Sequence, residues 1–502
     1  MPGGRASCGP RPAAPGSRTT RLELFYDLVF VFAFVNVTTL TANRLTPANL
    51  YRCLLVLALL WWLWTGFARL GNAVRADQGL LPLVGFLTVA ATFLLVLSVP
   101  GAFVDAPGSL NGPLVFAACY FVIRAAQLAV LGWMDWSDRV LRRRLLPRVV
   151  LPAVATALLV VAGTVPQRLA DRPVTVALQL GLWTVALLVE YVGGVILAQG
   201  WWVVVSAGHW AERHALMVLI ALGESIIALG LGPKTGLPLS GPVAIAALLG
   251  VLVVAMLWWA YFDTLAYALE QALHQARDRA ARLRLARDVY TFLHLPLIAG
   301  VILFALGLKD LLAESASPMT PTWGEPLGGF WVTVFYGGVG LYLLSLAGCA
   351  LVALREVHWP LLVTIVVLAA VAPFAAPIPE LVALALLTGL TTLGLLAGDV
   401  ERKRPTEPGP AARAGGAARR GGGAEPLAPA APVSARSEPG LRAPQSRTKT
   451  GTVTGPGNHG GGRAPGRRGA AAGRCGPATA RRGCPRTSCR SRRRSWSPRS
   501  GA

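Results

Sequence analysis

Long apolar runs alternate with short polar connections over the first 400 residues of the chain. Each run has about 17–25 residues, which is the length of α-helix that crosses the roughly 30 Å hydrocarbon layer of a membrane. Pro377 and Pro379 separate the last two runs. The pattern predicts an all-α, polytopic integral membrane protein with about twelve transmembrane helices, at residues 24–43, 48–68, 79–99, 112–132, 146–164, 173–193, 213–232, 241–262, 290–308, 329–352, 359–377 and 380–399.

Composition agrees with this pattern, since 54% of the residues are hydrophobic and only 14% are charged. Residues 1–20 are polar and contain no apolar core of a cleavable signal peptide, so the first membrane helix is expected to act as the targeting signal. The sequence contains no glycine-rich phosphate loop, no His-Glu-x-x-His and no Gly-x-Ser-x-Gly motif. These absences disfavour ATP hydrolysis and hydrolase chemistry, and we expect neither enzymatic activity nor a cofactor.

The basic residues are distributed unevenly along the chain. Residues 401–502 contain 22 Lys and Arg but only 4 Asp and Glu, so they supply most of the net charge of +23. This tail is rich in Arg, Gly, Pro and Ala, which predicts a disordered segment, as we also predict for the N-terminal arm, residues 1–20. The tail has one large aromatic residue, Trp496, so specific nucleic acid binding is not expected. The same composition would arise from GC-rich DNA translated in a shifted frame.

Among the short connections, Lys and Arg gather on one predicted face of the membrane, mainly at residues 139–148 and 277–287. Because basic loops remain in the cytoplasm, this distribution predicts that both termini lie on the cytoplasmic side of the membrane. Residues 263–289 read as an amphipathic cytoplasmic linker helix. This linker and the basic loops are expected to contact anionic lipid.

The chain also shows an internal similarity. A shift of 197 residues places Glu224 on Asp27 and the pair Trp258-Trp259 on Trp61-Trp62. We therefore predict two similar six-helix halves, residues 21–199 and 200–400, related by a pseudo-twofold axis along the membrane normal. Tryptophans gathered at the two membrane surfaces offer a simpler explanation for the matching pairs, and we expect the pairs either to form such an interfacial band or to pack between the two halves.

Charged residues inside the predicted helices are the candidates for function, because burying a charge in a membrane is unfavourable without a partner or a purpose. Asp27 and Glu224 are predicted to lie at equivalent depths of the two halves, as a paired site that binds a cation or exchanges a proton. The alternative is a static role, in which each carboxylate pairs with Arg21, Arg124 or Arg213 or forms hydrogen bonds to a helix end.

Further polar residues are expected to support this site. Arg124 is predicted to bind an anion or to pair with Asp27, Glu190 or Glu224. A cluster of polar side chains follows residue 208: His209, Glu212, Arg213 and His214. It could form an incomplete metal site, an ion pair or an anchor at the membrane interface. His294 is expected to relay protons or to bond to a carbonyl freed by Pro296. We expect no metal. The supporting residues are Arg21, Glu23, Arg124, Glu190, His209, Glu212, Arg213, His214 and His294.

Two motifs carry a resemblance to a known family. They are Glu23-Leu-Phe-Tyr-Asp-Leu-Val-Phe-Val and, from His209, Trp-Ala-Glu-Arg-His followed by Ile-Ala-Leu-Gly-Glu224-Ser-Ile. In these motifs and their order, the chain resembles the bacterial low-temperature-requirement A family over about residues 20–400. Tyr26 replaces a usual Phe, and Ala215 a usual Gly. The resemblance implies a polytopic inner-membrane protein linked to growth in the cold, and it implies no particular activity.

These observations favour a secondary transporter or a proton- or cation-coupled permeation protein for a small solute or ion. An ion channel is one alternative. A non-transporting scaffold or lipid-interacting protein of cold adaptation is another, and it predicts that loss of either acid changes only folding or abundance.

Overall fold

The computed structural model describes residues 14, 16–42, 45–103, 108, 110–135, 139–169, 172–197, 204–231, 240–315 and 323–403. Within these residues the chain is helical and contains no strand. Most of the predicted tail, residues 404–502, lies outside the described residues, as do residues 1–13 of the predicted arm. The α-helices are α1 (Arg21–Ala42), α2 (Pro47–Ala73), α3 (Leu81–Ser98), α4 (Gly112–Asp135), α5 (Arg139–Thr164), α6 (Pro166–Leu169), α7 (Arg172–Leu197), α8 (Ala207–Leu231), α9 (Gly241–Trp259), α10 (Ala266–His274), α11 (Arg279–Leu285), α12 (His294–Ser315), α13 (Gly329–Leu354), α14 (Trp359–Ala375) and α15 (Glu380–Lys403).

Eleven helices of the described part are long and apolar enough to cross a membrane. A twelfth apolar helix, α14, is shorter, with 17 residues. It ends before Pro377, and α15 begins after Pro379, so the two prolines separate two helices as the sequence predicts. The prediction of a polytopic helical membrane protein is confirmed.

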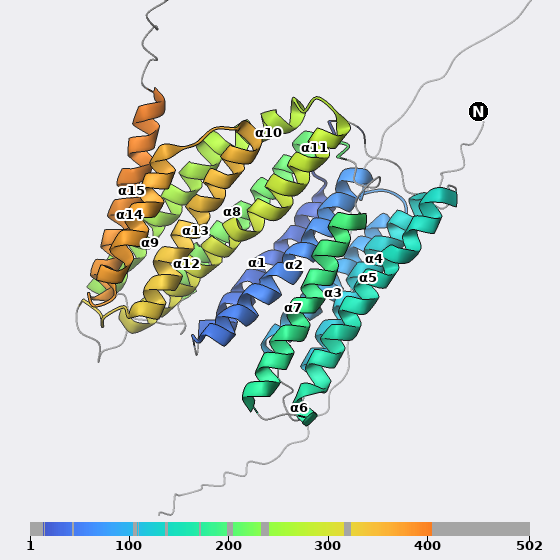
Figure 1. The fold of residues 1–502 in the computed structure, drawn as a ribbon, viewed down its shortest axis with the longest axis horizontal. Helices are drawn as coiled ribbons and strands as arrows, with labels where there is room; N and C mark the ends of the chain where they lie inside the picture. The colour runs from blue at the N-terminus through green and yellow to red at the C-terminus, as the bar shows by residue number, and fades with distance from the viewer. Residues whose placement is uncertain are drawn as a thin grey trace, which may run out of the picture. The chain divides into compact units, whose positions relative to one another are not determined.

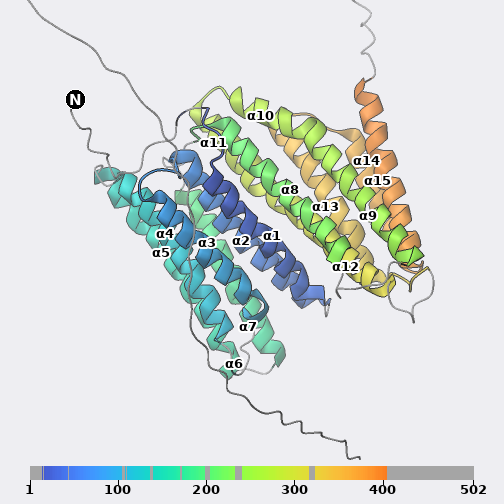
Figure 2. The same cartoon turned by 180° about the vertical axis from the view of Figure 1, so that it is seen from behind.

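The helices form two groups, α1–α7 and α8–α15, with α1 and α2 lying next to α8 and α12 (Figures 1 and 2). In the first group, α1 packs on α2 and α3, and the contacts continue through α4, α5 and α7 back to α2. The second group repeats this order with α8, α9, α12, α13, α14 and α15. The internal sequence repeat itself stays a prediction.

Local sequence signals define several helix starts. The side chains of Thr46 and Ser240 cap α2 and α9 by accepting backbone N–H bonds, and Pro47 and Pro242 suit the first turns of these helices. Thr20 and Glu23 form a reciprocal capping box at the start of α1: the Glu23 carboxylate accepts from the Thr20 N–H at 2.7 Å, and Thr20 Oγ1 accepts from the Glu23 N–H. Residues 16–20, predicted as disordered, are therefore placed against the helices.

The predicted linker helix at residues 263–289 is two short helices instead of one. α10 ends at His274, and α11 begins after Asp278, whose carboxylate caps it. Two π-helical segments, Ala260–Leu265 and Ala286–Leu293, connect α9 to α10 and α11 to α12. The chain must reverse direction between α9 and α12, and one continuous helix over these residues would prevent this.

Candidate functional site

The interface between α1 and α8 carries the candidate site. Three side-chain contacts cross it with the same offset of 186 residues, which shows that the two helices run parallel: Glu23 with His209, Asp27 with Arg213, and Thr38 with Glu224. Asp27 and Glu224 are thus separated by 11 residues of helix, or about 16 Å along the axis. This register corrects the expectation that the two acids lie at equivalent depths and form one paired site.

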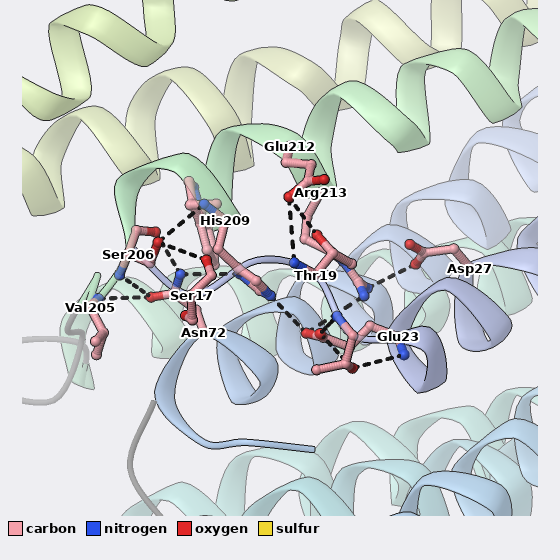
Figure 3. A network of polar contacts seen from close by, with 12 residues as sticks. Ser17, Thr19, Glu23, Asp27, Asn72, Val205, Ser206, His209, Glu212 and Arg213 are labelled. Carbon is pink, nitrogen blue, oxygen red and sulfur yellow. Dashed lines mark hydrogen bonds and ion pairs between the residues drawn. The ribbon is translucent and has the colours of Figure 1, made fainter. Parts of the chain in front are cut away.

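Asp27 lies in the first of two separate polar clusters, which we call the inner cluster (Figure 3). Its Oδ1 accepts hydrogen bonds from Trp64 Nε1 and from Arg213 Nη2, both at 2.8 Å. Its Oδ2 is buried and has no hydrogen-bond partner among the described residues. An unpartnered carboxylate oxygen in a buried site is unfavourable, so this atom is where a proton or a cation would be accommodated.

Glu23, by contrast, uses both of its carboxylate oxygens. Oε2 belongs to the capping box, while Oε1 accepts from His209 Nε2 at 2.9 Å and lies 3.7 Å from Arg213 Nη1. Gly71 of α2 lies directly against Oε1, and a Cβ atom there would overlap it. Glu23 is therefore held in place by its surroundings and serves to fix the start of α1 against α8.

Asn72 of α2 determines which tautomer His209 adopts. The Asn72 Oδ1 accepts from the backbone N–H groups of Val205 and Ser206, so its Nδ2 must point the other way. That Nδ2 donates to the Ser206 carbonyl and to His209 Nδ1, at 2.7 and 3.2 Å. Because Nδ1 accepts, His209 carries its proton on Nε2 and is neutral.

The inner cluster contains one more negative than positive group when both acids are ionised. Its charged members are the carboxylates of Glu23 and Asp27 and the guanidinium of Arg213, all buried, and His209 is neutral. With both acids ionised, the cluster has a net charge of −1. A buried excess charge is strongly disfavoured, and one proton or one monovalent cation would neutralise it.

Glu224 lies in a second cluster, which we call the outer cluster, together with Thr38 of α1 and Lys309 of α12. Its Oε1 accepts from Thr38 Oγ1 and from Lys309 Nζ, both at 2.8 Å, and Lys309 also contacts Thr38. Oε2 has no hydrogen-bond partner among the described residues. The pair is balanced in charge. Lys309 was not among the sequence candidates, because it follows directly after the predicted helix 290–308 and resembles an interfacial lysine.

Arg124 and Glu190 form a third cluster, within the first helix group. Arg124 binds Glu190 through Nε at 3.2 Å and Nη2 at 2.8 Å, and Glu190 also accepts from Tyr120 and Trp62. Of the three acids considered as partners for Arg124, the structure pairs it with Glu190 and not with Asp27 or Glu224. Each Glu190 oxygen accepts two bonds, which suits a structural role.

His214 and His294 lie next to each other in an aromatic environment. His214 Nδ1 bonds to the Trp210 carbonyl, and its ring packs against Trp64 and His294. His294 bonds to the Val289 carbonyl in the π-helical segment, and not to the carbonyl that Pro296 frees. Neither histidine bonds to the inner cluster.

The remaining candidates lie at the edge of the site. Glu212 accepts from Thr19 Oγ1 at 3.0 Å (Figure 3). Arg21 is exposed and forms no ion pair with Asp27. Among the described residues, no group of three or more His, Cys, Asp or Glu side chains is arranged to hold a metal ion.

The tryptophans of α2 are buried, so packing fits them and an interfacial band does not. Trp61, Trp62 and Trp64 have at most 2% of their surface exposed and donate to Thr291, Glu190 and Asp27, respectively. Trp258 and Trp259, the matching pair in the second half, are partly exposed. Sequence alone missed that Trp64 bonds to the candidate carboxylate.

Comparison with known proteins places the whole helical region in one family. The profile of the bacterial low temperature requirement A protein (LtrA) family matches residues 18–396. An uncharacterized protein of Rhizobium meliloti (strain 1021), RA0937, is 26% identical over 303 residues, which cover 58% of this chain and 69% of that protein. No solved structure matches the chain. Both family motifs lie on the two helices that build the inner cluster, and the chain belongs to the bacterial low temperature requirement A family.

Proposed function

We propose that the protein is a secondary transporter of the bacterial plasma membrane, coupled to a proton or a small monovalent cation, with Asp27 as the coupling group. The observation that carries this proposal is the unpartnered, buried Oδ2 of Asp27 in a cluster that lacks one positive charge. A carboxylate that takes up a proton needs an oxygen that is not already saturated by hydrogen-bond donors. Asp27 and Glu224 each have such an oxygen, whereas Glu23 and Glu190 do not, and only Glu224 has its charge balanced by a lysine, Lys309.

The separation of the two clusters favours a transporter over a channel. Between Asp27 and Glu224, the facing helices present buried apolar side chains, including Phe30 and Phe34 of α1 and Met217 of α8. An ion cannot cross three turns of apolar packing, so passage requires α1 to move relative to α8. Such movement of one helix group against another is the basis of alternating access.

The predicted topology gives the two clusters different positions in the membrane. With the N-terminus in the cytoplasm, the inner cluster lies near the cytoplasmic end of α1 and the outer cluster near its opposite end. A proton at Asp27 would then exchange with the cytoplasm. Glu224, neutralised by Lys309, would be reached from the other side when the helices move.

The test is proton, sodium and potassium flux through full-length protein reconstituted in liposomes. Asp27→Asn keeps Oδ1 as acceptor for Trp64 and Arg213 but removes the ionisable oxygen. Asp288→Asn is the matched control, because Asp288 pairs only with its neighbour Arg287 in the part of the chain that the structure describes. We expect flux in the wild type and the control, and its loss in Asp27→Asn at unchanged folding.

Wild-type flux in the Asp27→Asn variant would exclude Asp27 as the coupling group. No ion flux from well-folded wild-type protein under any gradient would contradict ion coupling and favour a scaffold role in cold adaptation.

A further inference from the structure

A pocket with a volume of about 630 Å³ opens beside the inner cluster. Its walls come from residues 17–22, from the end of α2 with the loop that follows, and from the first turns of α3. Gly71 lines the pocket and also touches Glu23, so one residue of α2 separates the pocket from the cluster. The proposed transport function does not require this pocket.

The charges around the pocket are mostly positive. Arg18, Arg21 and Arg75 line it together with a single acidic residue, Asp77. Arg75 forms an exposed ion pair with Asp77 at 3.2 Å. Arg18 and Arg21 form no ion pair with any carboxylate in the part of the chain that the structure describes. Two guanidinium groups at the rim of one concavity are therefore available to an anion.

The segment that carries these two arginines is held in a fixed position. Thr19 Oγ1 donates to Glu212 of α8, and the Ser17 carbonyl accepts from Ser206 Oγ at 3.2 Å (Figure 3). Thr20 belongs to the capping box of α1. Because these contacts order the backbone before any ligand arrives, binding needs little further loss of conformational freedom.

We infer that this pocket binds a phosphate- or carboxylate-bearing ligand through Arg18 and Arg21. Arginine is suited to this chemistry because its planar guanidinium binds either group through two parallel hydrogen bonds. Two sources present that chemistry at the predicted cytoplasmic face: a soluble anion, and the headgroup of an anionic lipid.

The experiment uses full-length protein in nanodiscs and two probes. Binding of radiolabelled inorganic phosphate is measured by equilibrium dialysis in phosphatidylcholine nanodiscs. The melting temperature is then compared with and without phosphatidylglycerol in the nanodiscs. The variant is R18Q/R21Q. The control is Arg284→Gln, which removes an exposed basic residue of α11 outside the pocket and on the same predicted face. All proteins must melt alike in phosphatidylcholine alone.

If a soluble anion is the ligand, phosphate binds the wild type and the control, and R18Q/R21Q weakens this binding at least about tenfold. If a lipid headgroup is the ligand, phosphatidylglycerol stabilises the wild type and the control but not R18Q/R21Q, and free phosphate binds none of them. Equal responses in the pocket variant and the control would overturn the inference, because the basic residues would then act only as a general surface charge. Absence of both responses in the wild type would also overturn it.

Discussion

Arg213 is the one cation of the inner cluster, beside the two carboxylates of Glu23 and Asp27, so we expect the fold to depend on it. Arg213→Gln leaves the carboxylates of Glu23 and Asp27 buried together without a cation. Removal of one partner from a buried ion pair costs about 3–5 kcal/mol of unfolding free energy. We expect a loss in this range for Arg213→Gln. Asp27→Asn should cost less than about 1 kcal/mol, because it removes the excess charge and keeps both bonds to Oδ1.

The double variant Asp27→Asn/Arg213→Gln separates charge balance from simple packing. If the cost of losing Arg213 is electrostatic, neutralising Asp27 should restore at least about 1 kcal/mol relative to Arg213→Gln alone. The measurement is unfolding in mixed micelles, followed through tryptophan fluorescence. Strict additivity of the two single effects would refute the reasoning, because it would mean that the two side chains do not interact energetically.

Three further changes test other parts of the site. Gly71→Ala should displace the Glu23 carboxylate and lower the melting temperature, and a serine at the same position should do no better, since both add the Cβ that overlaps Oε1. Lys309→Gln should lower the free energy of unfolding by about 3–5 kcal/mol, measured by chemical unfolding. Adding Glu224→Gln should recover part of this loss, and no recovery would argue against a buried ion pair. Asn72→Ala should cost about 1–3 kcal/mol, because it leaves two backbone N–H groups without their acceptor, and amide hydrogen exchange at residues 205–206 should rise, while unchanged exchange would contradict the assignment.

Much of the helical architecture could be predicted from sequence, because each membrane helix must be apolar over its whole length. The two prolines between α14 and α15 are a local signal that the prediction used. The Thr20–Glu23 capping box is a local signal that the prediction of a disordered arm missed. Contacts between helices are different, since they depend on register. The 197-residue repeat aligned Asp27 with Glu224, whereas the packed helices align Asp27 with Arg213 at an offset of 186.

Only some residues of the candidate site could be identified from the sequence. Arg213 was weighed as a partner for Asp27 because both are charges in apolar surroundings. Asn72 and Trp64 gave no such signal, since an amide near a helix end and a tryptophan in a membrane helix are ordinary. Lys309 belongs to the site only because α12 continues to Ser315, beyond the predicted end of the span. Such residues could be found only once the helices were packed.

Whether Asp27 exchanges a proton is measured most directly by infrared difference spectroscopy of the full-length protein in lipid, recorded across a step in pH. We expect a band of a buried, protonated carboxylic acid to change in the wild type and in Asp288→Asn, and this change to be missing in Asp27→Asn. The same band change in Asp27→Asn, or none in the wild type, would contradict the assignment of Asp27 as the coupling group.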